Sequence, residues 1–214
     1  MAGIVGIVGS APRALVSTLE NLTRPLLLQP RSTAQSWYND RAAMCRVSPG
    51  AGESETQPVF NRDRTKCIVF FGECFDYDGQ KRELIERGRT FVLGDSDAEF
   101  CLNLYEEYGE SAFARLDGSF CFAILDIGKG EALLVADRMG TRPLFYGLTS
   151  DGSLVFATQV SAVLSSPGVD GRLDISAVIE FCSLQRVVGS KTYHRGVQML
   201  APASALRYRS GQVA

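Results

Sequence analysis

The feature that most constrains this chain is the apolar run at its very beginning. Residues 1–9 read Met-Ala-Gly-Ile-Val-Gly-Ile-Val-Gly, and β-branched residues between glycines are typical of a short buried strand. Most chain termini are polar and loosely packed. A strand that starts with the first residues therefore predicts that the amino end lies inside the structure.

A buried amino end has one known chemical use, which is catalysis by an N-terminal nucleophile. In that chemistry residue 2 becomes the first residue once Met1 is removed, its side chain attacks a carbonyl, and its free α-amino group acts as the base. The predicted buried strand at the amino end suits this chemistry, but Ala2 occupies the nucleophile position. Because a methyl group cannot attack a carbonyl, the sequence predicts a catalytic architecture without its catalyst.

Composition excludes several classes of function. The chain has 214 residues, is 45% hydrophobic and carries a formal net charge of -2, which suits an ordinary globular protein. The near-neutral charge predicts neither nucleic-acid nor membrane-surface binding. No apolar run approaches the ~20 residues of a membrane span, and the start lacks the basic region of a secretory signal. We therefore expect a cytoplasmic protein.

The cysteines and the single histidine limit the chemistry further. The six cysteines show no CxxC spacing: they are Cys45, Cys67, Cys74, Cys101, Cys121 and Cys182. Most lie in apolar runs, which predicts buried free thiols in a reducing compartment. With only His194, in a turn-like stretch, no metal site is expected. Catalysis by Ser-His-Asp or Cys-His is disfavoured for the same reason.

Hydrophobic periodicity divides the rest of the chain into strands and helices. Short apolar runs predict strands at residues 42–47, 67–71, 120–125, 132–135, 144–146, 154–156 and 205–208. Helical spacing predicts helices at residues 12–28, 77–88, 160–164 and 175–182, and one more that Ser96 opens. Residues 29–42 are predicted to be irregular and residues 48–56 to form a surface loop. Hairpins and helices in separate runs predict an α+β fold with antiparallel sheets.

Two helices carry more detailed signals. Ser96 and Glu99 have the spacing of a capping box, in which each side chain bonds the other residue's backbone N–H. In the charged helix at 77–88, Leu84 and Ile85 are expected to face the core.

Six motifs then follow one another along the chain: F-G-E at 71–73, G-D-S-D-A-E at 94–99, L-D-G-S-F-C-F-A at 116–123, D-R-M-G-T-R-P-L-F-Y at 137–146, F-A-T at 156–158 and R-G-V-Q-M-L-A-P at 195–202. In this order they resemble the N-terminal glutaminase domain of glutamine-hydrolysing asparagine synthetases, a class II glutamine amidotransferase. The motif at 137–146 is the most specific. The resemblance implies a single domain over residues 1–214 with the Ntn-hydrolase-like αββα sandwich, two antiparallel sheets between helical layers.

The resemblance also implies which residues hold glutamine. Arg46 falls where the family's arginine pairs with the substrate carboxylate, and a guanidinium suits bidentate binding of that group. Glu73 falls at the glutamate of the family's Asn-Gly-Glu motif, and Asp97 at the aspartate that holds the substrate ammonium group. Glu73 and Asp97 equally fit a purely structural role as caps of turns.

The reactive positions depart from the family pattern. Ala2 replaces the nucleophilic cysteine, and Phe71 replaces the asparagine that donates to the oxyanion. Gly72 is the third residue at a catalytic position of the family, after Ala2 and Phe71. We expect Gly72 and Glu73 to end the preceding strand. Losing one oxyanion donor costs roughly 2–4 kcal/mol of transition-state stabilisation. The family's Arg-Gly-Pro-Asp element is also missing near residues 29–33, so several independent changes favour natural loss of activity over engineering.

Cofactors and partners follow from the resemblance alone. In the family, ammonia passes to an ATP-using synthetase domain, and no pyrophosphate loop occurs in this chain. No cofactor is therefore expected in this domain, and ATP and Mg only in an associated synthetase domain, in cis or in trans. Glutamine is a candidate ligand, and a homodimer is compatible with the sequence.

Three hypotheses remain open at this point. The first is a non-catalytic structural partner of a synthetase, similar to the corresponding domains of β-lactam synthetases and lasso-peptide cyclases, which need no ammonia. The second is a glutaminase that was inactivated by engineering or that uses another thiol, for which Cys74 is nearest in sequence to the site. The third is a module that binds an amino acid without turning it over.

Overall fold

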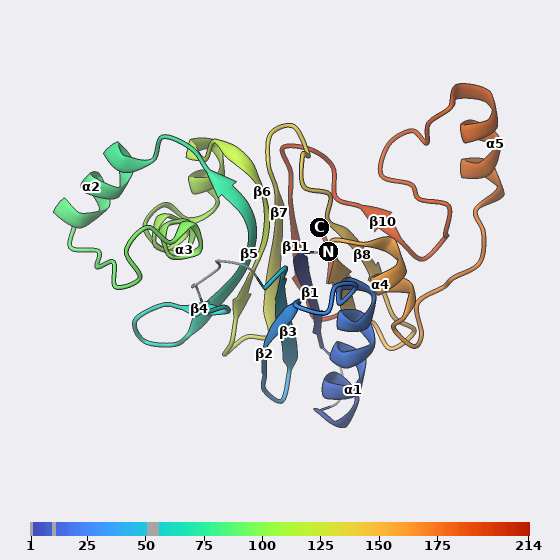
Figure 1. Cartoon of the computed structure of the whole chain (residues 1–214), viewed down its shortest axis with the longest axis horizontal. Coiled ribbons are helices and arrows are strands. Elements are labelled where there is room, and N and C mark those ends of the chain that lie inside the picture. Colours follow the sequence, from blue (N-terminus) through green and yellow to red (C-terminus); the bar gives the residue numbers. More distant parts are fainter. Residues whose placement is uncertain (1, 10–11, 51–55) are drawn as a thin grey trace.

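Two six-stranded antiparallel sheets stack face to face, and helices cover the outer face of each sheet (Figure 1). The structure, a computed structural model, describes residues 2–9, 12–50 and 56–214. This arrangement confirms the predicted α+β sandwich with helical layers outside both sheets.

The strands of each sheet follow a fixed spatial order. Sheet A consists of β10 (Gln198–Met199), β8 (Phe145–Leu148), β9 (Leu154–Ala157), β1 (Gly3–Val8), β3 (Ala42–Ser48) and β2 (Thr33–Tyr38). Sheet B consists of β12 (Gln212–Val213), β11 (Ala205–Arg209), β7 (Glu131–Ala136), β6 (Gly118–Asp126), β5 (Lys66–Cys74) and β4 (Val59–Phe60).

The helices divide between the two outer faces. They are α1 (Pro12–Thr23), α2 (Asp78–Glu86), α3 (Asp97–Tyr108), α4 (Val160–Leu164) and α5 (Ile175–Leu184), with short 3-10 turns at Arg24–Leu26 and Gly109–Arg115. In Figure 1, α2 and α3 lie beyond sheet B, whereas α1 and α4 lie beyond sheet A. Helix α5 stands apart from both layers at the far end of the molecule.

The first strand lies in the middle of sheet A. All six residues of β1 are buried, because β3 pairs with one edge of the strand and β9 with the other. Alternate side chains of β1 point to opposite faces of the sheet. Ile4 and Val8 enter the core between the sheets, and Val5 and Ile7 enter the core under α1. The predicted buried strand is confirmed over Gly3–Val8, and Ala2 is half-buried, whereas Met1 lies outside the described residues.

Strand β5 shows the same division on sheet B. Cys67, Val69 and Phe71 face the core between the sheets, and Ile68 and Phe70 face the core under α3. The continuous apolar run therefore reflects burial on both faces, as the sequence predicts. The strand does not end at Gly72, however, and continues to Cys74.

Several local predictions were wrong. Residues 29–42 contain an edge strand, β2, whose alternating polar and half-buried residues hide the signal because only one neighbour, β3, pairs with it. Helix α1 ends at Thr23, where Pro25 introduces a 3-10 turn. Ile85 is 52% exposed because only Leu84 of that helix turns fully inward.

The predicted capping bond at the start of α3 is confirmed, because Ser96 Oγ accepts from Glu99 N at 3.0 Å. The Glu99 carboxylate also accepts from the backbone N–H groups of Val92 and Leu93, both at 2.8 Å. It thereby anchors the loop that leads into the helix.

Candidate functional site

The candidate site lies where the first residues of the chain reach the space between the sheets. Ile4 lies opposite Arg46 in the β1–β3 pairing, so both side chains project from the same face of sheet A. By the alternation of a strand, the half-buried Ala2 lies on that face as well.

Arg46 is buried and bonded within the protein. Its side chain is only 8% exposed, and its Nη1 donates to the carbonyl oxygens of Val47, at 2.5 Å, and Gly3, at 3.4 Å. The second bond ties the guanidinium to the residue after Ala2. The Thr158 hydroxyl packs against Gly3 on the opposite face of sheet A, beside Leu26, because a Cβ built on Gly3 would lie 1.9 Å from it.

Phe71 brings a second arginine to the site. The Arg46 guanidinium carbon lies 5.0 Å from the centre of the Phe71 ring, and that of Arg142 lies at the same distance. Both separations are within the range of cation–π attraction. The Nε of Arg142 is buried without a hydrogen-bond partner among the described residues. Arg142 belongs to the motif at 137–146, whose pattern alone gives no indication of this contact.

Gly72 and Glu73 have different environments although they are adjacent. Gly72 has a φ of 126°, and a Cβ built on it would lie 2.0 Å from the Ser119 carbonyl oxygen. Only glycine fits there, because both the backbone conformation and the distance forbid a side chain. Glu73 pairs with Ser119 across β5 and β6, but its side chain is exposed and has no hydrogen-bond partner among the described residues.

Asp97 lies in the first turn of α3 and contacts Tyr77. Burial raises the pKa of the Tyr77 hydroxyl, and the charge of Asp97 and a hydrogen bond to it raise that pKa further. The Tyr77 ring in turn stacks on Phe100 with ring centres 4.2 Å apart. The carboxylate that the resemblance assigns to a substrate ammonium group thus has a partner inside the protein.

The motif at 137–146 has a structural explanation. The buried Asp137 accepts from Met139 N at 2.8 Å, Thr141 Oγ1 at 2.7 Å and Phe120 N at 3.2 Å. Burial by itself would raise the pKa of Asp137, but the hydrogen bonds from Thr141, Met139 and Arg142 together outweigh it, so the pKa lies below its ordinary value. This carboxylate organises the turn that carries Arg142 to Phe71.

Cys121 and Cys74, on the neighbouring strands β6 and β5, face different cores. Cys121 faces the core between the sheets, but burial raises the pKa of its thiol, and the nearby Arg46 offsets only part of that effect. Cys74 points the other way, toward α3, where its Sγ lies 3.5 Å from that of Cys101. The prediction of free thiols holds for all six cysteines, but Cys182 is exposed and Cys74 half-buried.

His194 is held in a turn, as predicted, with its Nδ1 2.8 Å from the Gly171 carbonyl oxygen. Over residues 2–9, 12–50 and 56–214, no three His, Cys, Asp or Glu side chains gather in a way that could hold a metal ion. In the same ranges, no helix is both long and apolar enough to cross a membrane.

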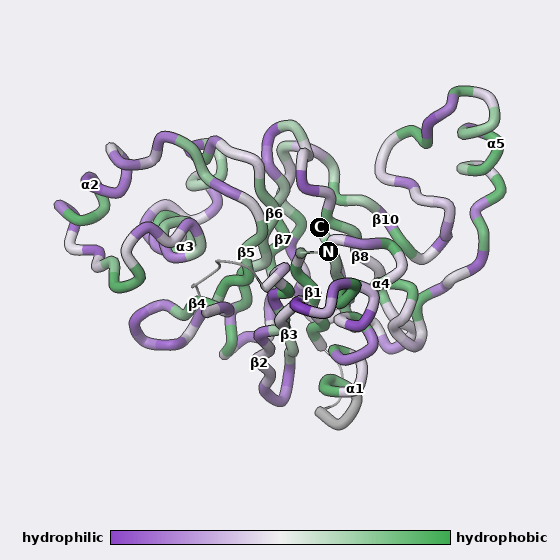
Figure 2. Tube along the Cα trace, viewed as in Figure 1, coloured by the Kyte–Doolittle hydropathy of each residue, from purple (hydrophilic) through white to green (hydrophobic). Residues whose placement is uncertain are grey.

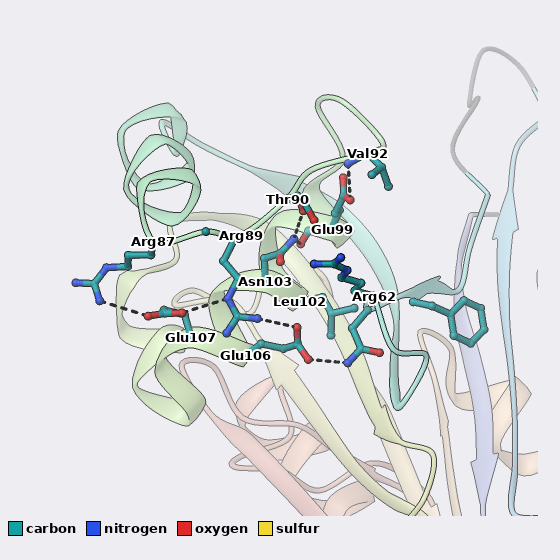
Figure 3. Close-up of a pocket in the computed structure, with 13 residues that line it drawn as sticks. Arg62, Arg87, Arg89, Thr90, Val92, Glu99, Leu102, Asn103, Glu106 and Glu107 are labelled. Carbon is teal, nitrogen blue, oxygen red and sulfur yellow. Dashed lines mark hydrogen bonds and ion pairs between the residues drawn. The ribbon is translucent and has the colours of Figure 1, made fainter.

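A separate hollow of about 410 Å³ lies between α3 and the loops that precede it (Figure 3). Its charges neutralise one another: Arg89 pairs with Glu106 at 3.0 Å and with Glu107 at 3.1 Å, and Arg87 pairs with Glu107 at 3.3 Å. These pairs leave a structural ion network rather than an evident ligand site.

The sandwich and the central first strand define an amidotransferase fold of the N-terminal-nucleophile type. Glutamine phosphoribosylpyrophosphate amidotransferase from Bacillus subtilis superposes with a TM-score of 0.66 at 16% identity, over 99% of this chain and 48% of that chain. A glutamine aminotransferase class-II domain protein from Silicibacter pomeroyi superposes with a TM-score of 0.54 at 11% identity, over 99% and 97% of the two chains. At these identities the likeness concerns the fold alone.

Sequence comparison gives the family. The glutamine amidotransferase domain model matches residues 1–214, and the chain belongs to this family. It is 31% identical to glutamine-hydrolysing asparagine synthetase 3 of Bacillus subtilis, over 67% of this chain and 23% of the relative. It is 30% identical to the glutamine-hydrolysing asparagine synthetase of Zea mays, over 76% of this chain and 28% of the relative. It is 27% identical to asparagine synthetase 1 of Bacillus subtilis, over 98% of this chain and 34% of the relative. The chain therefore spans between 23% and 34% of these relatives' length.

Proposed function

We propose that this chain is a glutaminase-like domain that does not hydrolyse glutamine and that serves as a structural partner of an ATP-dependent, amide-forming synthetase domain. One observation carries the proposal: Ala2 offers no nucleophile, and Phe71, in contact with Arg46 and Arg142, offers no donor. ATP and Mg would act only in the synthetase domain.

The environment of Phe71 supports natural loss of the activity. An engineered trap for bound glutamine would change the nucleophile and keep the other groups. Here the ring is packed into the core between the sheets, and Arg46 directs hydrogen bonds to the backbone of Gly3 and Val47. The residues around Ala2 thus form a packed cluster that suits a stable domain better than a substrate pocket.

A large apolar surface supports the partner role. Helix α5 and its flanking segments expose seven large side chains, which we call the α5 face: Leu173, Ile175, Ile179, Phe181, Leu184, Val188 and Tyr193. Each exposes between 39% and 59% of its surface, and Figure 2 shows the apolar stretches of this projecting helix. Of the ten residues of α5, only Ala177 is buried. Large apolar side chains exposed in this number on one segment indicate an interaction site.

The α5 face is ordered before any partner binds. Asp174 caps the helix by accepting from Ser176 N at 2.9 Å. Glu180 forms an ion pair with Lys191 on the returning segment, and the Phe181 and Tyr193 rings meet edge to face at 5.7 Å. A preorganised surface loses less conformational entropy on binding.

The charges around the α5 face indicate the chemistry of its partner. Its acidic residues are engaged within the segment: Asp170 with Arg172, Asp174 with Ser176 and Glu180 with Lys191. Arg186 and Arg195 are exposed and make no side-chain hydrogen bond or ion pair among the described residues. We therefore expect an apolar partner surface bordered by carboxylates.

The size of the α5 face favours a synthetase domain over a second copy of this chain. A stable interface between separate proteins needs about 20–30 residues on each side, and the α5 face is smaller. A domain in the same chain or complex docks at an effective concentration in the millimolar range, for which a small interface suffices. The relatives are chains at least about three times as long, since this region covers 34% of them or less.

Glutamine hydrolysis is the direct test of inactivity. We expect the purified chain to release no ammonia from glutamine above a heat-denatured sample, and Ala2→Cys to release none, because Phe71 still replaces the donor. Ammonia release by the unmodified chain would overturn the proposal. Hydrolysis by Ala2→Cys alone would show that Phe71 is compatible with the chemistry and that the site is not degenerate.

Docking is tested separately, so that the two halves of the proposal can fail independently. In a chimera, this chain replaces the matching region of Bacillus subtilis asparagine synthetase 1. Amide hydrogen exchange of residues 173–193 is then compared between the chimera and the free chain. We expect these amides to exchange more slowly in the chimera than in the free chain. Ile179→Asp should abolish this protection, whereas the matched control Val92→Asp should retain it. Unchanged exchange, or a dimer of the free chain that Ile179→Asp dissociates, would contradict this role.

A second candidate is an amino-acid-binding module, which Glu73 favours because its exposed side chain has no hydrogen-bond partner among the described residues. The internal bonds of Arg46 and Asp97 argue against it. Calorimetry with glutamine, glutamate and asparagine distinguishes the two candidates: binding of any of the three supports the module, and absence of heat with all three rejects it.

A further inference from the structure

The thiols of Cys74 and Cys101 meet between β5 and α3. Their Sγ atoms lie 3.5 Å apart, and neither cysteine is in a disulfide. A disulfide bond is about 2.05 Å long, so an approach of about 1.5 Å would join the two sulfurs. We propose that Cys74 and Cys101 form a site of reversible disulfide formation, which reacts with low-molecular-weight disulfides such as glutathione disulfide.

The two thiols differ in access in the way that this chemistry needs. Cys74 is half-buried at the end of β5, so this residue is partly accessible to a small disulfide from solvent. Cys101 is 1% exposed and lies behind it on α3. Cys74 is therefore the attacking thiol, and Cys101 the thiol that resolves the mixed disulfide.

The other four cysteines lack one of these properties. Cys45, Cys67 and Cys121 are fully buried; burial raises the pKa of each thiol, to about 12 for Cys67, and so disfavours the reactive thiolate. Cys182 is exposed on α5, but among the described residues it has no second thiol in contact. The Cys74–Cys101 pair alone combines access with a resolving neighbour.

The exchange balances in two steps. The Cys74 thiolate attacks one sulfur of glutathione disulfide; a Cys74–glutathione bond forms, and the departing glutathione thiolate takes up the proton that Cys74 lost. The Cys101 thiolate then attacks the Cys74 sulfur, the Cys74–Cys101 bond forms, and the second glutathione leaves with the proton from Cys101. Two protein thiols are oxidised, and one glutathione disulfide is reduced to two glutathione molecules.

The cross-link would fix two elements that carry candidate site residues. Cys74 follows Glu73 at the end of β5, and Cys101 lies one helical turn after Asp97 on α3. Packing of Tyr77 on Phe100 already holds the connecting segment against the helix. The disulfide would therefore limit motion of Glu73 relative to Asp97, whether or not the chain binds glutamine.

Mass spectrometry of the intact chain tests the proposal. After treatment with glutathione disulfide, we expect a loss of two hydrogen atoms from the protein, reversed by dithiothreitol. Digestion with trypsin and Glu-C should yield peptides 74–81 and 100–106 joined to each other, since cleavage after Glu73 separates Cys74 from Cys67. We expect the melting temperature to rise by about 5–10 °C on oxidation, because the bond closes a long loop.

Three variants and one internal control make the test decisive. Cys74→Ser should form no joined peptide. Cys101→Ser, and Cys101→Ala if the buried hydroxyl prevents folding, should instead retain glutathione on Cys74. The exposed Cys182 reports that the reagent reacted. A glutathione adduct on Cys182 without the joined peptide in the unmodified chain would overturn the proposal.

Discussion

The guanidinium of Arg46 lies over the ring of Phe71, with 5.0 Å between the guanidinium carbon and the ring centre. The resemblance assigns these two positions to substrate binding and to oxyanion stabilisation, and in this chain they contact each other. Because Arg46 also bonds the Gly3 carbonyl oxygen, the contact extends to the strand that follows Ala2. Phe71 is thus part of the packing between the sheets and lies beside both Arg46 and Arg142.

The Phe71–Arg142 contact should contribute measurably to stability. A double-mutant cycle with Phe71→Leu and Arg142→Met retains most of the apolar volume and removes the cation–π attraction. We expect a coupling free energy of about 0.5–2 kcal/mol from urea unfolding. Arg138→Met is the matched control, since Arg138 is exposed on the same turn; an equal coupling there would contradict the assignment.

Gly72 should tolerate no side chain. We expect Gly72→Ala to destabilise the fold by more than about 3 kcal/mol or to prevent folding, because the methyl group would meet the Ser119 carbonyl oxygen. Gly79→Ala is the control: nothing lies within 4 Å of its added Cβ, and it should stabilise α2 by up to about 1 kcal/mol. Equal midpoints of urea unfolding for the two variants would refute this explanation.

Asp137 should make stability depend on acid pH. Its folded pKa lies below the ordinary value, so its contribution is complete above the unfolded pKa of about 4 and is lost as the pH falls through the folded pKa. We expect Asp137→Asn to lose about 2–4 kcal/mol at pH 7, because an amide cannot accept from all the donors around it. Urea unfolding from pH 7 to pH 3 should show a smaller decline for the variant than for the unmodified chain.

The α5 face should not contribute to the stability of the free domain. We expect Ile179→Asp to change the free energy of unfolding by less than about 0.5 kcal/mol, and to reduce binding of a hydrophobic dye. Ala177→Asp should disrupt α5, because Ala177 is the buried residue of that helix; circular dichroism would report the lost helical signal. A large loss of stability in Ile179→Asp would mean that this side chain packs within the domain.

The sequence pattern predicted the α+β fold with antiparallel sheets because its strongest signals are those that burial creates, whereas the sandwich followed from the family resemblance. Strands β1 and β5 are apolar on both faces, and each pairs with a strand on either side. Edge strand β2 was not predicted because one of its edges and most of its side chains meet water. Its residues therefore form no apolar run from which a strand could be recognised. Ile85 was expected to face the core, but whether it does depends on how α2 is rotated about its axis. That rotation is determined by the packing of the helix in the folded domain.

The candidate site was less predictable for a different reason. Arg46 and Phe71 are far apart in the chain and meet only because the sheets stack, which no local pattern encodes. Arg142 was visible within its motif, but its contact with Phe71 depends on the turn that Asp137 organises. The Cys74–Cys101 approach likewise needs α3 to lie on β5.

The place of β1 has a consequence for the order in which the protein is made. Val5 leaves the ribosome early, but its partner Ala157 in β9 is synthesised only in the last third of these residues. Until then one edge of an apolar strand has no neighbour, and unpaired strand edges invite association with other chains. Nascent chains stalled before residue 154 should therefore depend on a chaperone that shields this segment.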